Sequence, residues 1–222
     1  MADFSKFNWT FFHSAPVVAI LRGLSAEACE RVAEALSETG FTTLEVTINT
    51  PDVGQIISHL SRQFPSLNVG AGTVCTPDQL DEALTAGASF VVTPILDEEV
   101  ITRCVTDRIP VFPGAYTPTE IYRAWNLGAT AVKVFPASQL GVEYLKDIHG
   151  PLPQIKLVPT GGVSLENIAS FFAAGVYGVG MGSSLLRSDL IAAGDYSSLK
   201  DHLRRVRAQL PQHSGGGAQE PT

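Results

Sequence analysis

Eight short apolar runs alternate with helical stretches along this chain of 222 residues. The stretches between the runs, such as residues 26–37 and 79–85, carry apolar residues at spacings of three and four, which is the pattern of an amphipathic helix. Strands that alternate with helices form right-handed βαβ units, and such units build a parallel sheet. The runs are residues 17–21, 43–47, 67–71, 90–93, 110–112, 130–135, 155–159 and 176–181.

Helix stop and start signals support this reading. The glycines expected to end helices are Gly40, Gly87, Gly128 and Gly175, and the hydroxyl residues expected to begin them are Ser25, Thr76, Thr117 and Ser164. Eight strand–helix units in about 200 residues predict a closed (β/α)8 TIM barrel. A doubly wound open sheet is the alternative, but the Gly-x-Gly-x-x-Gly turn typical of that fold is missing after the first run.

We expect a single α/β domain. Residues 16–210 would form the barrel, residues 1–15 a helical cap, and residues 211–222 a flexible C-terminal tail that lacks apolar residues to bury. The hydrophobic content of 45% is enough for one large core. We see no second domain.

Charge and cysteine usage exclude several classes of function. Lys and Arg number 15 against 22 Asp and Glu, a net charge of −7, so we expect no nucleic-acid surface. The three cysteines lack a Cys-x-x-Cys pair and are typical of reduced thiols in a cytoplasmic enzyme. The five histidines are scattered, so we expect no metal, and no run reaches membrane-spanning length.

Lys133 is a charged residue inside an apolar run, Ala131-Val132-Lys133-Val134-Phe135-Pro136. Burial would disfavour its ammonium form, lower its pKa and leave a free amine able to attack a carbonyl. Glu45 is a second charge in an apolar run, and an amine with a carboxylate is the minimum set for Schiff-base chemistry with proton transfer. A structural Lys–Glu pair or a solvent-facing lysine is the alternative.

The active site of a (β/α)8 barrel lies at the carboxyl ends of its strands, so residues at the run ends are the candidates. Arg22 could clamp a substrate carboxylate. Two glycine-rich loops, after the seventh and eighth runs, occupy the positions where this fold often binds phosphate. The substrate-binding candidates are Arg22, Thr47, Thr73, Pro94, Phe135, Thr160, Gly161, Gly162, Gly182 and Ser183.

Five motifs carry a family resemblance: Leu44-Glu45-Val46-Thr47, Gly70-Ala71-Gly72-Thr73-Val74, Phe112-Pro113-Gly114, Val132-Lys133-Val134-Phe135-Pro136-Ala137 and Pro159-Thr160-Gly161-Gly162. Together they resemble the motifs of the class I aldolases of 2-keto-3-deoxy-6-phosphogluconate and 4-hydroxy-2-oxoglutarate. The resemblance spans residues 16–186 and implies that Lys133 is the Schiff-base lysine and Glu45 the general acid/base. It also implies phosphate binding at Gly161, Gly162 and Ser183, and a homotrimer.

The chain combines features of two branches of that family. The phosphogluconate branch usually carries an arginine where this chain has Asn49, and the arginine of Leu21-Arg22-Gly23 is similar to the branch that acts on the galactonate epimer. Thr160, in contrast, is similar to the gluconate branch. The resemblance therefore leaves the configuration at C4 of the substrate open.

The expected reaction is cleavage of 2-keto-3-deoxy-6-phosphogluconate to pyruvate and D-glyceraldehyde 3-phosphate through a Schiff base on Lys133. No cofactor is expected, because the imine supplies the electron sink. The alternatives are the same chemistry on 2-keto-3-deoxy-6-phosphogalactonate or 4-hydroxy-2-oxoglutarate, and, from a different class, a phosphate-binding barrel isomerase or binding protein without aldolase activity.

Overall fold

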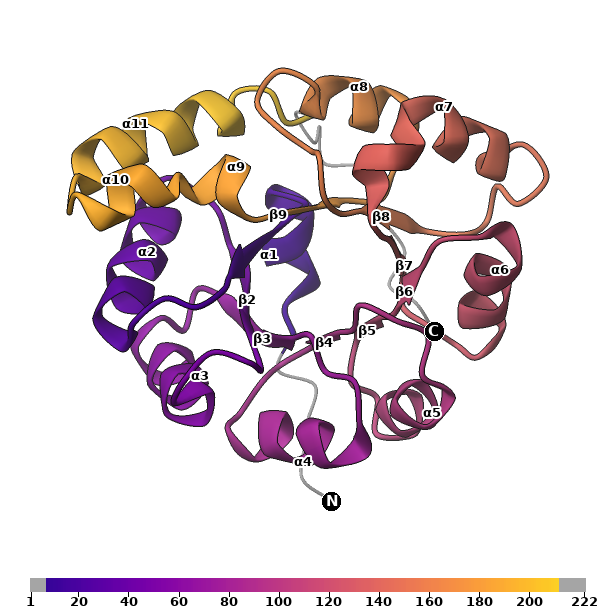
Figure 1. Ribbon diagram of the computed structural model, residues 1–222, viewed down its shortest axis with the longest axis horizontal. Coiled ribbons are helices and arrows are strands. Elements are labelled where there is room, and N and C mark those ends of the chain that lie inside the picture. The colour runs from indigo at the N-terminus through magenta and orange to yellow at the C-terminus, as the bar shows by residue number, and fades with distance from the viewer. Residues whose placement is uncertain (1–6, 212–222) are drawn as a thin grey trace.

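The computed structural model describes residues 7–211 and shows a curled parallel sheet with helices around it (Figure 1). Each apolar run of the sequence coincides with a strand, and one further short strand follows the fifth. The strands are β1 Val17–Leu21, β2 Thr43–Thr47, β3 Asn68–Gly72, β4 Val91–Val92, β5 Val111–Phe112, β6 Gly114–Ala115, β7 Val132–Val134, β8 Leu157–Pro159 and β9 Val179–Met181.

The strands pair in parallel as two sheets, one in the order β5-β4-β3-β2-β1-β9 and one in the order β6-β7-β8. Pro113, which has no N–H to donate, separates β5 from β6. One bridge, between Thr160 and Gly180, joins the segment after β8 to β9. The α/β class and the parallel sheet are confirmed, whereas the described strands form two sheets rather than one continuous eight-stranded ring.

The helices follow the strands as the sequence predicts. They are α1 Trp9–Ser14, α2 Ala26–Glu38, α3 Val53–Gln63, α4 Pro77–Thr85, α5 Glu98–Thr106, α6 Pro118–Asn126, α7 Ala137–His149, α8 Ile168–Ala173, α9 Ser183–Leu186, α10 Ser188–Ala192 and α11 Tyr196–Arg207. None of the helices in residues 7–211 is long and apolar enough to cross a membrane.

Three of the four predicted helix starts are confirmed. Ser25, Thr76 and Thr117 each accept a hydrogen bond from a backbone N–H of the first turn. Ser164 is the exception, because α8 begins only at Ile168. Ser164 instead begins a separate turn, in which its carbonyl accepts a hydrogen bond from the N–H of Asn167. The four glycines expected to end helices all have positive φ, between 80° and 93°.

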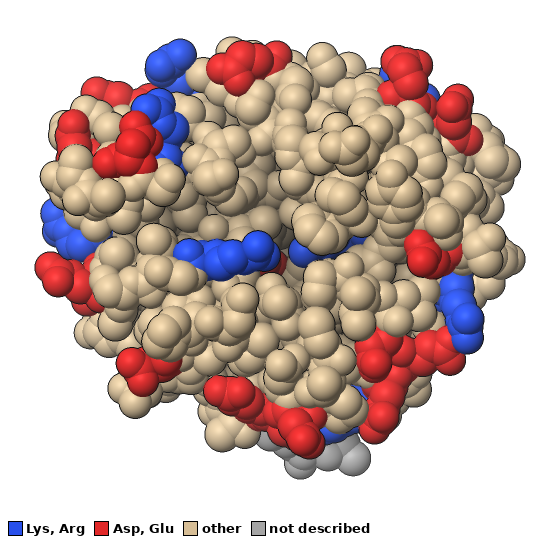
Figure 2. All heavy atoms as spheres, viewed as in Figure 1, with Lys and Arg blue, Asp and Glu red and all other residues tan. Residues whose placement is uncertain are grey.

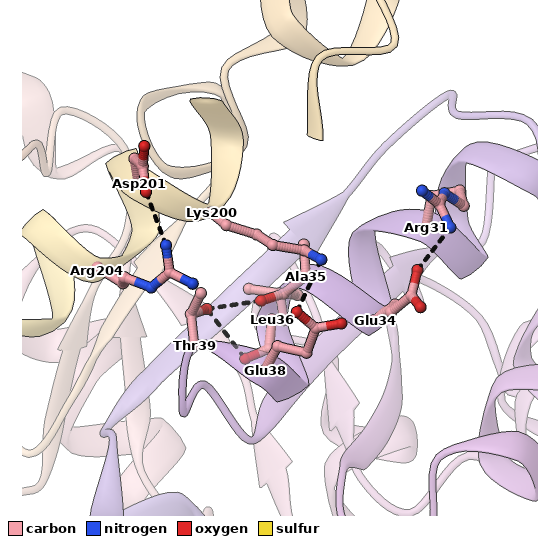
Figure 3. Close-up of polar contacts among 9 residues, drawn as sticks. All are labelled: Arg31, Glu34, Ala35, Leu36, Glu38, Thr39, Lys200, Asp201 and Arg204. Atoms are coloured by element: carbon pink, nitrogen blue, oxygen red, sulfur yellow. Dashed lines mark hydrogen bonds and ion pairs between the residues drawn. The ribbon is translucent and has the colours of Figure 1, made fainter. Parts of the chain in front are cut away.

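Helix α2, which follows β1, packs against the last helix, α11 (Figure 3). Lys200 of α11 lies 2.7 Å from a carboxylate oxygen of Glu38 at the end of α2. The apolar side of α11, with Leu199, Leu203 and Val206, is fully buried. A surface ion pair contributes at most about 1 kcal/mol, so burial of these apolar side chains supplies most of the stabilisation.

The amino-end half of the space inside the curled sheet is filled by aromatic rings. Phe90, which immediately precedes β4, packs against Phe112 of β5; Phe112 in turn stacks on Phe12 of α1, and Phe7 contacts the same cluster. Apolar packing at this end leaves the carboxyl-end half for polar side chains. The beginning of the predicted cap and residues 212–222 of the predicted tail lie outside the described residues.

Candidate active site

A cavity of about 560 Å³ opens at the carboxyl ends of β1, β7, β8 and β9. Figure 2 shows a hollow near the centre of this face with basic side chains along it, and Arg22 and Lys133 are the two basic residues of the lining. Eight of the predicted site residues line it: Arg22, Lys133, Phe135, Thr160, Gly161, Gly162, Gly182 and Ser183.

Lys133 is the central residue of β7 and is only 4% exposed. Its Nζ lies 4.9 Å from the ring centroid of Phe135, so one side of the amine faces an aromatic surface. Burial lowers the pKa of Lys133, the nearby charge of Arg22 lowers it further, and the carboxylate of Glu45 opposes both. The surroundings therefore favour the neutral amine, which is the nucleophilic form.

Glu45 is the central residue of β2 and is 1% exposed. Burial raises the pKa of its carboxyl group, while Lys133 and Arg22 lower it. Among the described residues, nothing forms a hydrogen bond with its Oε2 atom. A second cavity of about 10 Å³, lined by Glu45, Lys133 and Thr160 among apolar side chains, lies beside it. That volume fits about one water molecule, which could carry a proton between the two groups.

Two glycines on neighbouring strands make room for the polar side chains. A Cβ on Gly72 of β3 would lie 2.6 Å from Cδ of Glu45, and one on Gly180 of β9 would lie 3.0 Å from Cγ2 of Thr160. Both distances are shorter than carbon–carbon contacts normally are. Sequence reasoning missed Gly72 and Gly180 as site residues. No signal in the sequence alone identifies them, because their role depends on which residues of the neighbouring strands lie beside them.

The far end of the larger cavity is formed by the loops that follow β8 and β9. Gly161 and Gly162 have φ values of 88° and 78°, and a Cβ on Gly162 would meet Ser138 at 2.7 Å. The hydroxyl of Ser184 donates to the carbonyl of Val163 at 2.6 Å, so it is already used within the fold. Ser183 is exposed at the start of α9, and its hydroxyl is therefore the better placed donor for a ligand.

Arg22 follows β1 and is exposed at the mouth of the larger cavity. No carboxylate in residues 7–211 pairs with it. An unpaired guanidinium at a cavity mouth can bind a planar carboxylate or a phosphate through two hydrogen bonds.

Three predicted residues lie at the same edge of the sheet but line neither cavity. Thr47 is buried, and its hydroxyl is 3.2 Å from that of Thr50. Thr73 follows β3 with a φ of 61°, and its carbonyl accepts from the thiol of Cys75. The backbone of Pro94 packs against Gly114. Within residues 7–211, no group of three His, Cys, Asp or Glu could hold a metal ion.

Comparison with known proteins gives consistent matches over most of the chain. A family model described as KDPG and KHG aldolase matches residues 10–202. The chain is 39% identical to a probable 2-dehydro-3-deoxy-6-phosphogalactonate aldolase of Rhizobium meliloti, covering 81% of this chain and 85% of that protein. It is 37% identical to the 2-dehydro-3-deoxy-phosphogluconate aldolase of Pseudomonas aeruginosa, covering 82% of this chain and 83% of the other.

A solved structure is similarly close. It is described as KDPG aldolase from Legionella pneumophila with pyruvate captured at low pH as a covalent carbinolamine intermediate. The TM-score is 0.82 at 32% identity, over 88% of this chain and 96% of the other.

Proposed function

Because the chain belongs to the KDPG and KHG aldolase family, and is therefore a carbon–carbon lyase, we propose that it cleaves 2-keto-3-deoxy-6-phosphogluconate through a Schiff base on Lys133. The products are pyruvate and D-glyceraldehyde 3-phosphate. The observation that carries the proposal is that the buried side chains of Lys133 and Glu45 line the same small cavity, and that Lys133 also lines the open cavity at the carboxyl ends of the strands. Pyruvate bound as a carbinolamine in the Legionella pneumophila structure supports it.

In this proposal Lys133 Nζ attacks the C2 ketone of the substrate. The carbinolamine loses water to give an iminium, which accepts the electron pair as the C3–C4 bond breaks. The aldehyde leaves, and protonation of the enamine followed by hydrolysis releases pyruvate. The lowered pKa of Lys133 supports this role, since only the free amine attacks a carbonyl.

Glu45 moves the protons, either directly or through one water in the small cavity. It assists loss of water from the carbinolamine and takes the proton of the C4 hydroxyl as the bond breaks. Burial raises the pKa of Glu45 above its usual value, and a raised pKa makes a carboxyl group a better proton acceptor once it is ionised.

The carboxylate and the phosphate of the substrate bind at opposite ends of the larger cavity. Arg22 holds the carboxylate next to C2. Gly161, Gly162 and Ser183 hold the phosphate with backbone N–H groups and a hydroxyl. Within residues 7–211 no other lysine or arginine lines the cavity, so in this proposal the phosphate is held by neutral donors.

The proposal also specifies the configuration at C4 of the substrate, the gluconate rather than the galactonate epimer. The relatives include proteins named for the galactonate and for the gluconate substrate, at similar identity. The alternative substrates are therefore 2-keto-3-deoxy-6-phosphogalactonate and 4-hydroxy-2-oxoglutarate. Turnover measured on both epimers and on the unphosphorylated analogue would rank the three. The family membership argues against a phosphate-binding isomerase or binding protein without aldolase activity.

We extend the proposal to architecture and assembly. The Thr160–Gly180 bridge and the continuity of the chain from β5 through Pro113 to β6 support a closed (β/α)8 barrel. The exposed apolar side chains of Ile95, Tyr116 and Tyr122 support subunit contact in a homotrimer. Three free cysteines support a cytoplasmic location.

The test is borohydride trapping with pyruvate, read by mass spectrometry. The native protein should gain a reduced pyruvyl adduct on Lys133. Lys133→Arg should stay folded, form no adduct and lack activity, because a guanidinium remains protonated. The matched control is Lys146→Arg, at an exposed lysine paired with Glu143, which should behave like the native protein. An adduct on a different lysine in Lys133→Arg would refute the assignment.

A further inference from the structure

A separate cavity of about 400 Å³ lies at the amino ends of β8 and β9, the opposite end of the sheet from the catalytic cavity. Lys156 immediately precedes β8, Tyr177 lies two residues before β9, and His13 is in the last turn of α1. His149, the last residue of α7, and Gln154 are the other polar residues of the described wall. The chemistry described above uses none of these residues.

The charge of this cavity is opposite to that of the molecule. The chain carries 22 acidic and 15 basic residues, yet among residues 7–211 the lining includes one lysine, Lys156, and no Asp or Glu. A cavity lined by one sign of charge raises the local concentration of the opposite ion. The occupant that the lining favours is therefore an anion.

Lys156 is the group best placed to bind it. Its Nζ lies 4.8 Å from the ring centroid of Tyr177, so the ammonium rests on an aromatic face. Within residues 7–211, no carboxylate or hydrogen-bond acceptor pairs with this ammonium. Burial of about half of the side chain lowers the pKa of Lys156, as expected for a partly desolvated ammonium.

The neighbouring polar groups do not compete for that lysine. The Tyr177 hydroxyl is 2.9 Å from Nε2 of His13, and burial raises the pKa of Tyr177 to about 12, so the phenol stays neutral. The ring nitrogens of His149 face the carbonyls of Ala174 and Ile155, at 3.3 and 3.2 Å. His149 is thus engaged with the backbone and acts as a wall of the cavity.

We propose that this cavity binds a small carboxylate or phosphate anion, with Lys156 as its charged contact and Tyr177 as its floor. The site is independent of the aldolase chemistry, since the two cavities share no residue and open at opposite ends of the strands. An anion seated here would pair the ammonium of Lys156 and link α1 to the amino ends of β8 and β9. It would bind the folded state alone and therefore raise the melting temperature.

The test follows the ring signals of Tyr177 by NMR in protein labelled at its five tyrosines, assigned with Tyr177→Phe. Inorganic phosphate and acetate are the two probes, one for each anion class. In the native protein at least one probe should shift the Tyr177 signals to saturation. Lys156→Met should abolish that shift while leaving aldolase activity unchanged. Lys146→Met, at a lysine already paired with Glu143, should retain it.

The choice of readout separates this site from the catalytic one. Phosphate bound near Gly161 would also change spectra, but it lies at the other end of the sheet from Tyr177. The probe that produces the saturable shift identifies the anion class. Absence of a saturable Tyr177 shift with both probes, or an undiminished shift in Lys156→Met, would overturn the proposal.

Discussion

Gly72→Ala is the change that most directly tests how the fold positions Glu45. Gly72 is the last residue of β3, and the carboxyl group of Glu45 on β2 lies over its Cα. A Cβ there would be 2.6 Å from Cδ and 3.1 Å from Cγ of Glu45. Ordinary carbon contacts are about 3.5–4.0 Å, so the carboxyl group must move by about 1 Å.

A displacement of that size has a calculable effect on the proposed reaction. A catalytic group misplaced by about 1 Å commonly reduces the rate about 100-fold, equivalent to about 2.7 kcal/mol of activation free energy. Overpacking a buried site lowers the free energy of unfolding by about 1–3 kcal/mol. Gly72→Ala should therefore reduce kcat strongly while the protein still folds.

The assay is steady-state cleavage of 2-keto-3-deoxy-6-phosphogluconate, combined with denaturant unfolding of the same variants. Gly54→Ala on α3 is the matched control, because its added Cβ would meet its nearest neighbour at an ordinary 4.0 Å. Glu45→Asp shortens the side chain, so the double variant Gly72→Ala/Glu45→Asp should recover part of the lost stability. The two changes should be non-additive in the free energy of unfolding. Native-like kcat in Gly72→Ala, or strict additivity, would refute the reasoning.

Two further predictions concern the charges around Lys133. Arg22→Ala should weaken binding of every 2-keto acid, about tenfold for each 1.4 kcal/mol of binding free energy lost. Asn49→Ala should weaken that binding much less. If Arg22→Ala instead left the affinity for pyruvate unchanged and weakened inhibition by phosphate, the proposed orientation of the substrate would be reversed. Because Arg22 lowers the pKa of Lys133, the same variant should move the acid limb of kcat/KM to higher pH. Glu45→Gln should reduce turnover by about two to four orders of magnitude. Glu45→Gln should also move the acid limb of kcat/KM to lower pH, since Glu45 raises the pKa of Lys133. The rate of borohydride trapping with pyruvate, measured across pH in both variants, tests the two shifts. An acid limb that stays at the native pH in either variant would contradict the prediction.

The sequence was informative wherever one residue broke a local pattern. Lys133 and Glu45 interrupt apolar runs, and both side chains are almost fully buried in the structure. The glycine-rich loops around Gly161 and Gly182 were visible for the same reason, since paired glycines after a strand are uncommon in a packed core. The strand–helix alternation likewise predicted the parallel sheet, because that periodicity is a local property.

Features that depend on contacts between strands were not predictable in this way. The role of Gly72 depends on the register that places β3 beside β2, which no local pattern specifies. Ser164 has the composition of a helix start, but the chain makes an additional turn before Ile168. Thr47 ends its strand like the other candidates, yet its hydroxyl pairs with Thr50. Sequence position alone could not separate it from Thr160, which does line the cavity.

The pairing of β1 has a consequence for synthesis on the ribosome. β1 lies between β2, which is the next strand along the chain, and β9, which is the last of the described strands. One edge of β1 therefore remains without a partner until β9 has emerged, and α2 lacks its contact with α11 until later still. Exposed strand edges recruit other chains. Nascent chains that stall before Val179 should thus depend on chaperones that cover this edge, whereas chains released after Leu210 should not.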